Sequence, residues 1–145
     1  MTVQRLFYTS RIVDEDEVRG AAIARQIAET SAIRNLADGL TGSLAYIDGH
    51  FIQVLEGDQR PLEETFERIC CDFRHYDLKL IDCQTAPSRL FAEWSMACLV
   101  DTDGAALDRH EALSEIRLLA TLNVREAVTQ MRRLLEESDK AAFAA

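Results

Sequence analysis

The pattern of apolar and polar positions along the chain predicts five strands and four helices. The expected strands are residues 3–9, 43–47, 49–57, 78–85 and 95–100. The expected helices are residues 14–34, 61–73 and 104–121, and one more that is capped by Asn123. A β-α-β unit followed by a second one is the split arrangement of ferredoxin-like folds. The sequence therefore predicts an α+β fold, with a ferredoxin-like β-α-β-β-α-β-β sheet that carries two helices on one face.

Several expected strands are apolar on both sides, so the second face of the sheet also needs a cover. The C-terminal segment can supply it, because its helices carry apolar stripes that include Leu113 and Ile116. We expect residues 1–101 to form the domain, residues 102–138 a helical hairpin on the second face, and residues 139–145 a frayed tail. The hairpin has two compatible roles, as a cover for the sheet and as an interface that transmits a signal.

The strand at residues 49–57 contains one polar side chain, Gln53, in an otherwise apolar middle. An amide that is buried without hydrogen-bond partners destabilises a fold by about 1–3 kcal/mol. Gln53 therefore has one of two kinds of partner. It either bonds to a neighbouring loop, as many core amides do, or it faces a bound polar ligand.

The net charge and the content of cysteine and histidine exclude several classes of function. The net charge of −9 argues against a nucleic-acid surface and against binding to anionic membranes. No apolar run follows Met1, so we expect no secretory signal, and no segment is long enough to span a bilayer. The four cysteines form no C-x-x-C pair and the three histidines are scattered, so we expect no metal site. A cytoplasmic chain that uses cysteine as a small apolar residue fits best.

Known catalytic motifs are missing from the sequence. It contains no G-x-G-x-x-G or Walker pattern and no G-x-S-x-G elbow. What remains is a set of polar residues without an obvious nucleophile: Tyr8, Ser31, Asn35, Gln53, Arg68 and Asp72. Such a set suits the binding of a polar, planar heterocycle better than it suits hydrolysis.

Several short motifs in this order resemble the BLUF family, whose members are blue-light sensors that use flavin. The resemblance runs from about Gln4 to Val100. It rests on Tyr8-Thr9-Ser10, Asn35 with Gly39-Leu40-Thr41-Gly42, Phe51 to Gly57, Arg68, Asp72-Phe73-Arg74-His75, Arg89, Phe91 and Trp94-Ser95-Met96.

The resemblance implies roles for particular residues. Tyr8 resembles the photochemical electron donor of the family, and Gln53 resembles the amide that bridges that tyrosine and the flavin. Trp94 and Met96 resemble the pair that relays the change. The other implied contacts of the flavin ring edge or the ribityl-phosphate chain are Ser31, Asn35, Arg68, Asp72, Arg74 and His75.

The resemblance also implies a mode of action. The expected cofactor is FAD, with FMN or riboflavin as alternatives, and no enzymatic turnover is expected. No output domain is expected in 145 residues, so the signal would pass to a separate partner, such as a cyclic-dinucleotide enzyme or a transcription regulator. Family members of this size typically form homo-oligomers.

Two other interpretations stay open at this point. Acylphosphatases share the split β-α-β layout, but they need a glycine-rich, arginine-bearing loop after the first strand, and residues 9–13 contain no glycine. A flavin-free ligand-binding or dimerisation module would leave Tyr8 and Gln53 as ordinary polar groups of the core. The absorption spectrum of the purified protein separates these possibilities.

Overall fold

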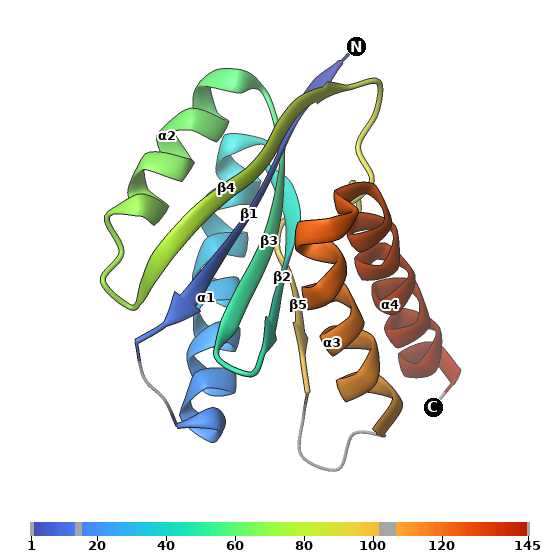
Figure 1. Cartoon of the computed structure of the whole chain (residues 1–145). Helices are drawn as coiled ribbons and strands as arrows, with labels where there is room; N and C mark the ends of the chain where they lie inside the picture. The colour runs from blue at the N-terminus through green and yellow to red at the C-terminus, as the bar shows by residue number, and fades with distance from the viewer. Residues whose placement is uncertain (1, 14–15, 102–106, 145) are drawn as a thin grey trace.

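The computed structural model describes residues 2–13, 16–101 and 107–144. In chain order its elements are β1 (Val3–Ile12), α1 (Glu17–Asp38), β2 (Thr41–Ile47), β3 (His50–Gly57), α2 (Gln59–Cys70), β4 (His75–Ala86), β5 (Ala97–Val100), α3 (Leu107–Leu122) and α4 (Val124–Ala144). The predicted order of strands and helices is confirmed (Figure 1).

The five strands form one sheet in the order β4-β1-β3-β2-β5. Strand β1 lies between β3 and β4 and is antiparallel to both, whereas β5 pairs with β2 in parallel. The hairpin between β2 and β3 turns at Asp48 and Gly49, whose φ angles of 47° and 81° are those of a tight two-residue hairpin turn. This turn sets the register of β3, and in the neighbouring pair Tyr8 then lies opposite Gln53.

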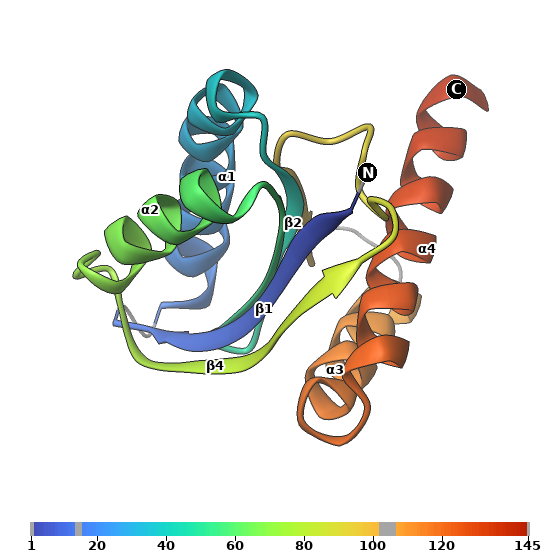
Figure 2. The same ribbon diagram turned by 90° about the horizontal axis from the view of Figure 1, so that it is seen from above.

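Helices cover both faces of the sheet. Helices α1 and α2 lie on one face, and α3 and α4 lie on the other (Figure 2). The alternation of side chains in β1 divides the core accordingly, because Leu6 and Tyr8 pack in the cluster with α1 and α2, whereas Phe7 packs in the cluster with α3 and α4. The predicted ferredoxin-like α+β fold, with a C-terminal hairpin on its second face, is what the structure shows.

Helix α1 extends further than the sequence predicts. It begins at Glu17, where the Asp16 carboxylate accepts the N–H of Arg19 at 3.1 Å, while residues 14 and 15 of the acidic run lie outside the described residues. It ends at Asp38 instead of near residue 34, because Gly39 adopts a left-handed φ of 72° that closes the helix. Asn35, predicted near the helix end, therefore sits a full turn inside it.

Helix α2 is shifted toward the N-terminus relative to the prediction. It begins at Gln59, so Pro61 is its third residue rather than its first. It ends at Cys70, because the Asp72 side chain accepts the N–H of Arg74 at 2.9 Å and starts a turn into β4. Phe73, predicted as the last residue of this helix, lies in that turn and is 93% exposed.

The C-terminal hairpin matches the prediction except at its end. Asn123 caps α4, with its side-chain oxygen accepting the N–H of Glu126 at 3.2 Å. Leu113, Ile116 and Met131 are fully buried against the sheet. The tail predicted to fray is helical as far as Ala144, and residue 145 lies outside the described residues.

The cysteines do not behave as the small apolar core residues that the sequence suggested. Cys70, Cys71 and Cys83 are exposed, and Cys98 is partly buried. The reason is position, because the first two lie at the end of α2 and the third lies on β4, an edge strand of the sheet.

Ser43 offers a test of the core. Its Oγ on β2 is buried and has no hydrogen-bond partner among the described residues. Because an unsatisfied buried hydroxyl is costly, Ser43→Ala should raise the free energy of unfolding by about 1 kcal/mol. Urea denaturation measures this change, and Ser88→Ala, at an exposed serine, is the matched control. A loss of stability in Ser43→Ala would contradict the prediction.

Candidate functional site

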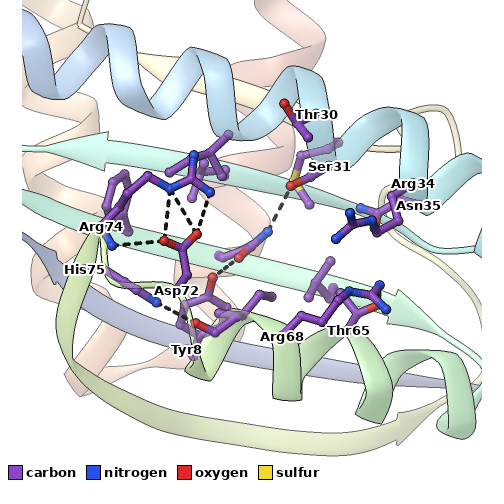
Figure 3. A pocket seen from close by; sticks show the side chains of 17 residues that line it. Tyr8, Thr30, Ser31, Arg34, Asn35, Thr65, Arg68, Asp72, Arg74 and His75 are labelled. Carbon is purple, nitrogen blue, oxygen red and sulfur yellow. Dashed lines mark hydrogen bonds and ion pairs between the residues drawn. The ribbon is translucent and has the colours of Figure 1, made fainter.

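A pocket of about 120 Å³ opens between α1, α2 and the sheet (Figure 3). Its apolar walls include Ile27 of α1, Leu44 and Phe51 of the sheet, and Ile69 of α2. Nine of the residues that the sequence selected line it: Tyr8, Ser31, Asn35, Gln53, Arg68, Asp72, Arg74, His75 and Met96. The fold thus brings residues from five elements and two connecting loops together around one pocket.

Tyr8, Gln53 and Met96 form a chain of contacts at the base of this pocket. The Tyr8 hydroxyl donates to Gln53 Oε1, and Gln53 Nε2 donates to the thioether sulfur of Met96 at 3.5 Å. All three side chains are buried. Phe66 packs edge-on against the Tyr8 ring at 5.8 Å between ring centroids, which helps to fix the ring.

The partners of Gln53 explain the direction of its amide. A thioether sulfur accepts hydrogen bonds but carries no proton to donate, so the NH₂ group belongs on the Met96 side. Burial, together with the Asp72 carboxylate, raises the pKa of Tyr8 well above its usual value. Tyr8 therefore keeps its proton at neutral pH, and Oε1 of Gln53 is the acceptor it needs.

Asn35 connects α1 to the segment that precedes β5. Its Nδ2 donates to the carbonyl of Ser95 at 2.8 Å, and the side chain is buried. The amide plane is therefore fixed, and no hydrogen bond among the described residues uses its Oδ1. An acceptor oxygen in a fixed position can receive an N–H from a ligand.

The charged side chains of the pocket pair with different partners. Arg68 and Asp72 lie four residues apart in the sequence, but they do not bond to each other. Arg68 instead lies 3.5 Å from the Asp38 carboxylate and donates to Thr65, whereas Asp72 binds Arg74 in the turn after α2. Hydrogen bonds from Arg74 hold the pKa of Asp72 below its usual value, although burial opposes the shift.

His75 ties the floor of the pocket to α2. Its Nδ1 lies 2.7 Å from Ser10 Oγ on β1, and its Nε2 lies 2.7 Å from the carbonyl of Ile69. His75 also contacts the Tyr8 ring edge-on at 6.5 Å between ring centroids. Both ring nitrogens of His75 are engaged by the protein, so it serves more as a brace for Tyr8 than as a free donor.

Trp94 is the one selected residue that lies outside the pocket. Its ring packs against Phe91 at 6.4 Å between ring centroids, in the cluster that faces α3 and α4. Met96 occupies the place beside Gln53 instead. Of the two residues compared with the family's relay pair, the structure therefore puts Met96 next to the amide.

Glu56, near the end of the strand expected at residues 49–57, was not among the residues predicted for the site. Its carboxylate is fully buried and accepts from Arg5 Nε at 2.9 Å and from the N–H groups of Leu90 and Phe91 at 2.8 Å each. It thereby anchors the loop that leads to Ser95 and Met96. The available signal was a carboxylate that directly follows the apolar residues Val54 and Leu55 of a strand, since a buried charge needs strong donors.

This anchor gives a prediction for stability. Glu56→Gln replaces one carboxylate oxygen with an NH₂ group that faces existing donors, so the free energy of unfolding should fall by about 2 kcal/mol. Urea denaturation measures the loss. Glu64→Gln is the control, because its ion pair with Arg60 is exposed and should contribute less than about 1 kcal/mol. Equal effects in the two variants would contradict an anchoring role.

Comparison with known proteins identifies the family of this chain. The family model for sensors of blue-light using FAD, called BLUF, matches residues 3–97, well over half of the chain. The chain belongs to the BLUF family. This BLUF domain is therefore a blue-light sensor that uses a flavin, as the sequence motifs predicted.

Two curated relatives and one solved structure illustrate the likeness. The blue light- and temperature-regulated antirepressor BluF of Escherichia coli is 34% identical over 91 residues, which are 63% of this chain and 22% of that protein. Photoactivated adenylate cyclase subunit beta of Euglena gracilis is 28% identical over 114 residues, 79% of this chain and 13% of that protein. The dark-state structure of BlrB, a BLUF protein, is 31% identical with a TM-score of 0.73, covering 94% of this chain and 96% of that one.

The chain spans less than a quarter of the length of these two curated relatives. The polar groups of the pocket suit the edge of a flavin ring. The buried Gln53 Nε2 has only a weak thioether acceptor, and Asn35 Oδ1 has no donor among the described residues, so both can bond a polar ring edge between apolar walls.

Among the described residues, no helix could cross a membrane.

Three further polar residues, Thr30, Arg34 and Thr65, line the pocket without having been selected from the sequence. Figure 3 shows Thr30 and Arg34 on α1 and Thr65 on α2. Helical spacing is the signal that could have found them. Arg34 is three residues after Ser31, and Thr65 is three before Arg68, so each of these two shares a helix face with a selected residue. Thr30 shares a face only with Arg34, four residues later.

Proposed function

We propose that this BLUF domain binds FAD in the pocket between α1 and α2 and signals through the hydrogen bonds of Gln53. The hydrogen bond from Tyr8 to Gln53, with Met96 as the second partner of that amide, is the observation that supports this proposal. These contacts form a buried polar chain that reaches the wall of the pocket. An amide that serves only the core would not have to lie at a pocket wall.

Arginine side chains at the pocket favour FAD over riboflavin. Arg34, Arg68 and Arg74 all line it, and guanidinium groups recognise phosphate oxygens through paired hydrogen bonds. Arg74 is held by Asp72 at 2.5 Å, which fixes its position, whereas Arg34 is exposed on α1. Asn35 Oδ1 and Ser31 would bond the edge of the ring. FMN would use the same arginines with a single phosphate.

When bound, the flavin absorbs blue light and becomes an electron acceptor. Tyr8 would be the donor beside it: its electron would pass to the flavin, and its hydroxyl proton would pass to Gln53 Oε1, which accepts its hydrogen bond. Because the raised pKa of Tyr8 disfavours a free phenolate, the proton would not leave before the electron. Both return to Tyr8 within the cycle, so no net oxidation occurs. Gln53 ends with its amide rearranged, by rotation or by tautomerisation, and with different hydrogen-bond partners.

The loop before β5 provides a route from this amide to the C-terminal helices. Met96 and Ser95 contact Gln53 and Asn35 at the pocket, and at the other end of the loop Arg132 of α4 donates to the carbonyl of Leu90 at 2.8 Å. A change at Gln53 can thus bias the position of α4 through bonded groups. A hydrogen bond of about 1 kcal/mol shifts a two-state equilibrium several-fold.

The output is proposed to be a separate protein, reached without enzymatic turnover by this chain, in the cytoplasm. The likeness to BlrB over nearly the full length of both chains supports a sensor that acts through contact. The relatives named for an antirepressor and for adenylate cyclase suggest partners of the regulator or cyclic-nucleotide enzyme class. A homo-oligomer that presents α3 and α4 is proposed as the functional form.

The absorption spectrum of the purified protein before and after blue light tests the proposal. A yellow protein whose absorption shifts slightly to the red and then recovers in the dark is the expected result. A colourless protein that does not take up added FAD would favour the flavin-free module. A yellow protein without any shift would contradict the role of Gln53. Release of the cofactor and chromatography then identify the flavin.

A further inference from the structure

A second cavity, of about 570 Å³, lies on the other face of the sheet. Strands β1, β3 and β4 form one wall, and helix α3 forms the other. Four nitrogen-bearing side chains line it, and we call it the cationic cleft after them: Arg11, His50, Lys79 and Arg117. Figure 2 shows α3 on the opposite face of the sheet from α1 and α2, so the cleft is separate from the flavin pocket.

The charge of the cationic cleft is opposite to that of the whole chain. The protein carries 25 acidic and 16 basic residues, yet the lining residues include three permanent cations and one carboxylate, Asp77. Lys79 lies 3.8 Å from that carboxylate in an exposed pair. Arg11 lies over the Tyr76 ring at 5.6 Å, and neither Arg11 nor Arg117 pairs with a carboxylate among the described residues.

His50 lies between two of these positive charges, because it is the strand partner of Arg11 across β1 and β3 and its ring contacts Arg117 of α3. Its Nδ1 lies 3.0 Å from the carbonyl of Asp48, so this nitrogen carries the proton, and its Nε2 accepts from Arg117 at 3.3 Å. Burial and the nearby guanidinium groups of Arg117 and Arg11 lower the pKa of His50. An anion bound beside His50 would therefore have Arg11 on one wall and Arg117 on the other, and both would attract it.

The remaining lining explains which anion fits. Ile52 and Leu118 provide an apolar surface, and Thr9 and Ser114 add hydroxyl groups. Two guanidinium groups with a lysine suit an anion that has three acceptor oxygens and more than one charge, which describes phosphate better than carboxylate. We propose that the cationic cleft binds a small phosphorylated molecule, with its phosphate between Arg11 and Arg117 and its uncharged part against Ile52 and Leu118.

The cationic cleft would lie on the opposite face of the sheet from Tyr8 and Gln53. Tyr8 pairs with Gln53 and points into the flavin pocket, whereas the next pair, Thr9 with Ile52, lines the cleft. The ligand would also join α3 to the sheet, because Arg117 belongs to α3 and Arg11 to β1. A molecule bound there would therefore hold the helical hairpin in place against the strands that carry the light signal.

Calorimetric titration of the full, flavin-loaded chain with AMP tests the proposal, with adenosine as the phosphate-free comparison. AMP should bind and adenosine should not. Arg117→Ala and Arg11→Ala should each weaken AMP binding about tenfold or more, since each removes a charge-assisted hydrogen bond. Arg133→Ala, at an exposed arginine of α4 that does not line the cleft, should leave it unchanged. Circular dichroism and flavin absorbance verify that each variant is folded.

Several results would overturn the site. These are no heat with AMP, equal binding of adenosine, or an equal loss in Arg133→Ala and Arg117→Ala. Loss of AMP binding in Arg68→Ala but not in Arg117→Ala would assign the probe to the flavin pocket instead. As a second readout, AMP should shift the NMR signals of the His50 ring, and an unchanged ring signal would exclude a phosphate beside Arg117.

Discussion

Gln53→Leu should retain the flavin but lose the light-induced red shift entirely. Leucine has nearly the shape of glutamine, so the pocket walls and the contacts of Asn35 and the arginines stay in place. What disappears is the only side chain that links the Tyr8 hydroxyl to Met96 in the described structure. Without an amide to rearrange, light leaves no lasting change in the hydrogen bonds of the pocket.

Stability does not obscure this experiment. Gln53→Leu leaves the Tyr8 hydroxyl without its acceptor, which costs about 1–3 kcal/mol, against a typical domain stability of about 5–15 kcal/mol. Gln84→Leu is the matched control, because Gln84 is exposed on β4 and lies outside the flavin pocket. Difference spectra before and after illumination provide the measurement. A normal shift in Gln53→Leu, or its loss in Gln84→Leu, would contradict the assignment.

The sequence predicted the fold well because the fold rests on local signals. Asp48 and Gly49 determine the central hairpin, and the alternation in β1 places Tyr8 and Phe7 on opposite faces. Asn123 marks the start of α4 by itself. Element ends were less predictable, because Phe73 continues a helical stripe in sequence while the Asp72 turn has already ended the helix.

The candidate site depended on a different kind of information. The order of the motifs along the chain identified nine residues that the structure places around one pocket. Ion pairs between residues far apart in the sequence were not predictable, because Arg68 approaches Asp38 only after α1 and α2 have packed on the sheet. Glu56 was missed for a similar reason, since its donors come from β1 and from a loop more than thirty residues away. The exclusion of Trp94 from the pocket likewise follows from the path of that loop.

Tyr8→Phe should abolish the red shift as completely as Gln53→Leu, for a different reason. Phenylalanine keeps the ring that packs against Phe66 and His75, so the pocket and the bound flavin are preserved. It removes the hydroxyl, which is the proposed electron and proton donor, and the hydrogen bond from that hydroxyl to Gln53 Oε1. The cost to stability is again about 1–3 kcal/mol, because that oxygen loses its donor.

The two variants can be told apart by flavin fluorescence. If Tyr8 is the electron donor, Tyr8→Phe removes the quenching of the excited flavin, so its fluorescence should increase. Gln53→Leu leaves the donor in place and should increase it less. Tyr76→Phe is the control, because Tyr76 is half exposed on β4 and lies under Arg11 rather than in the pocket. If Tyr8→Phe kept the quenching while losing the shift, Tyr8 would orient the amide without donating the electron, and another donor would have to be sought.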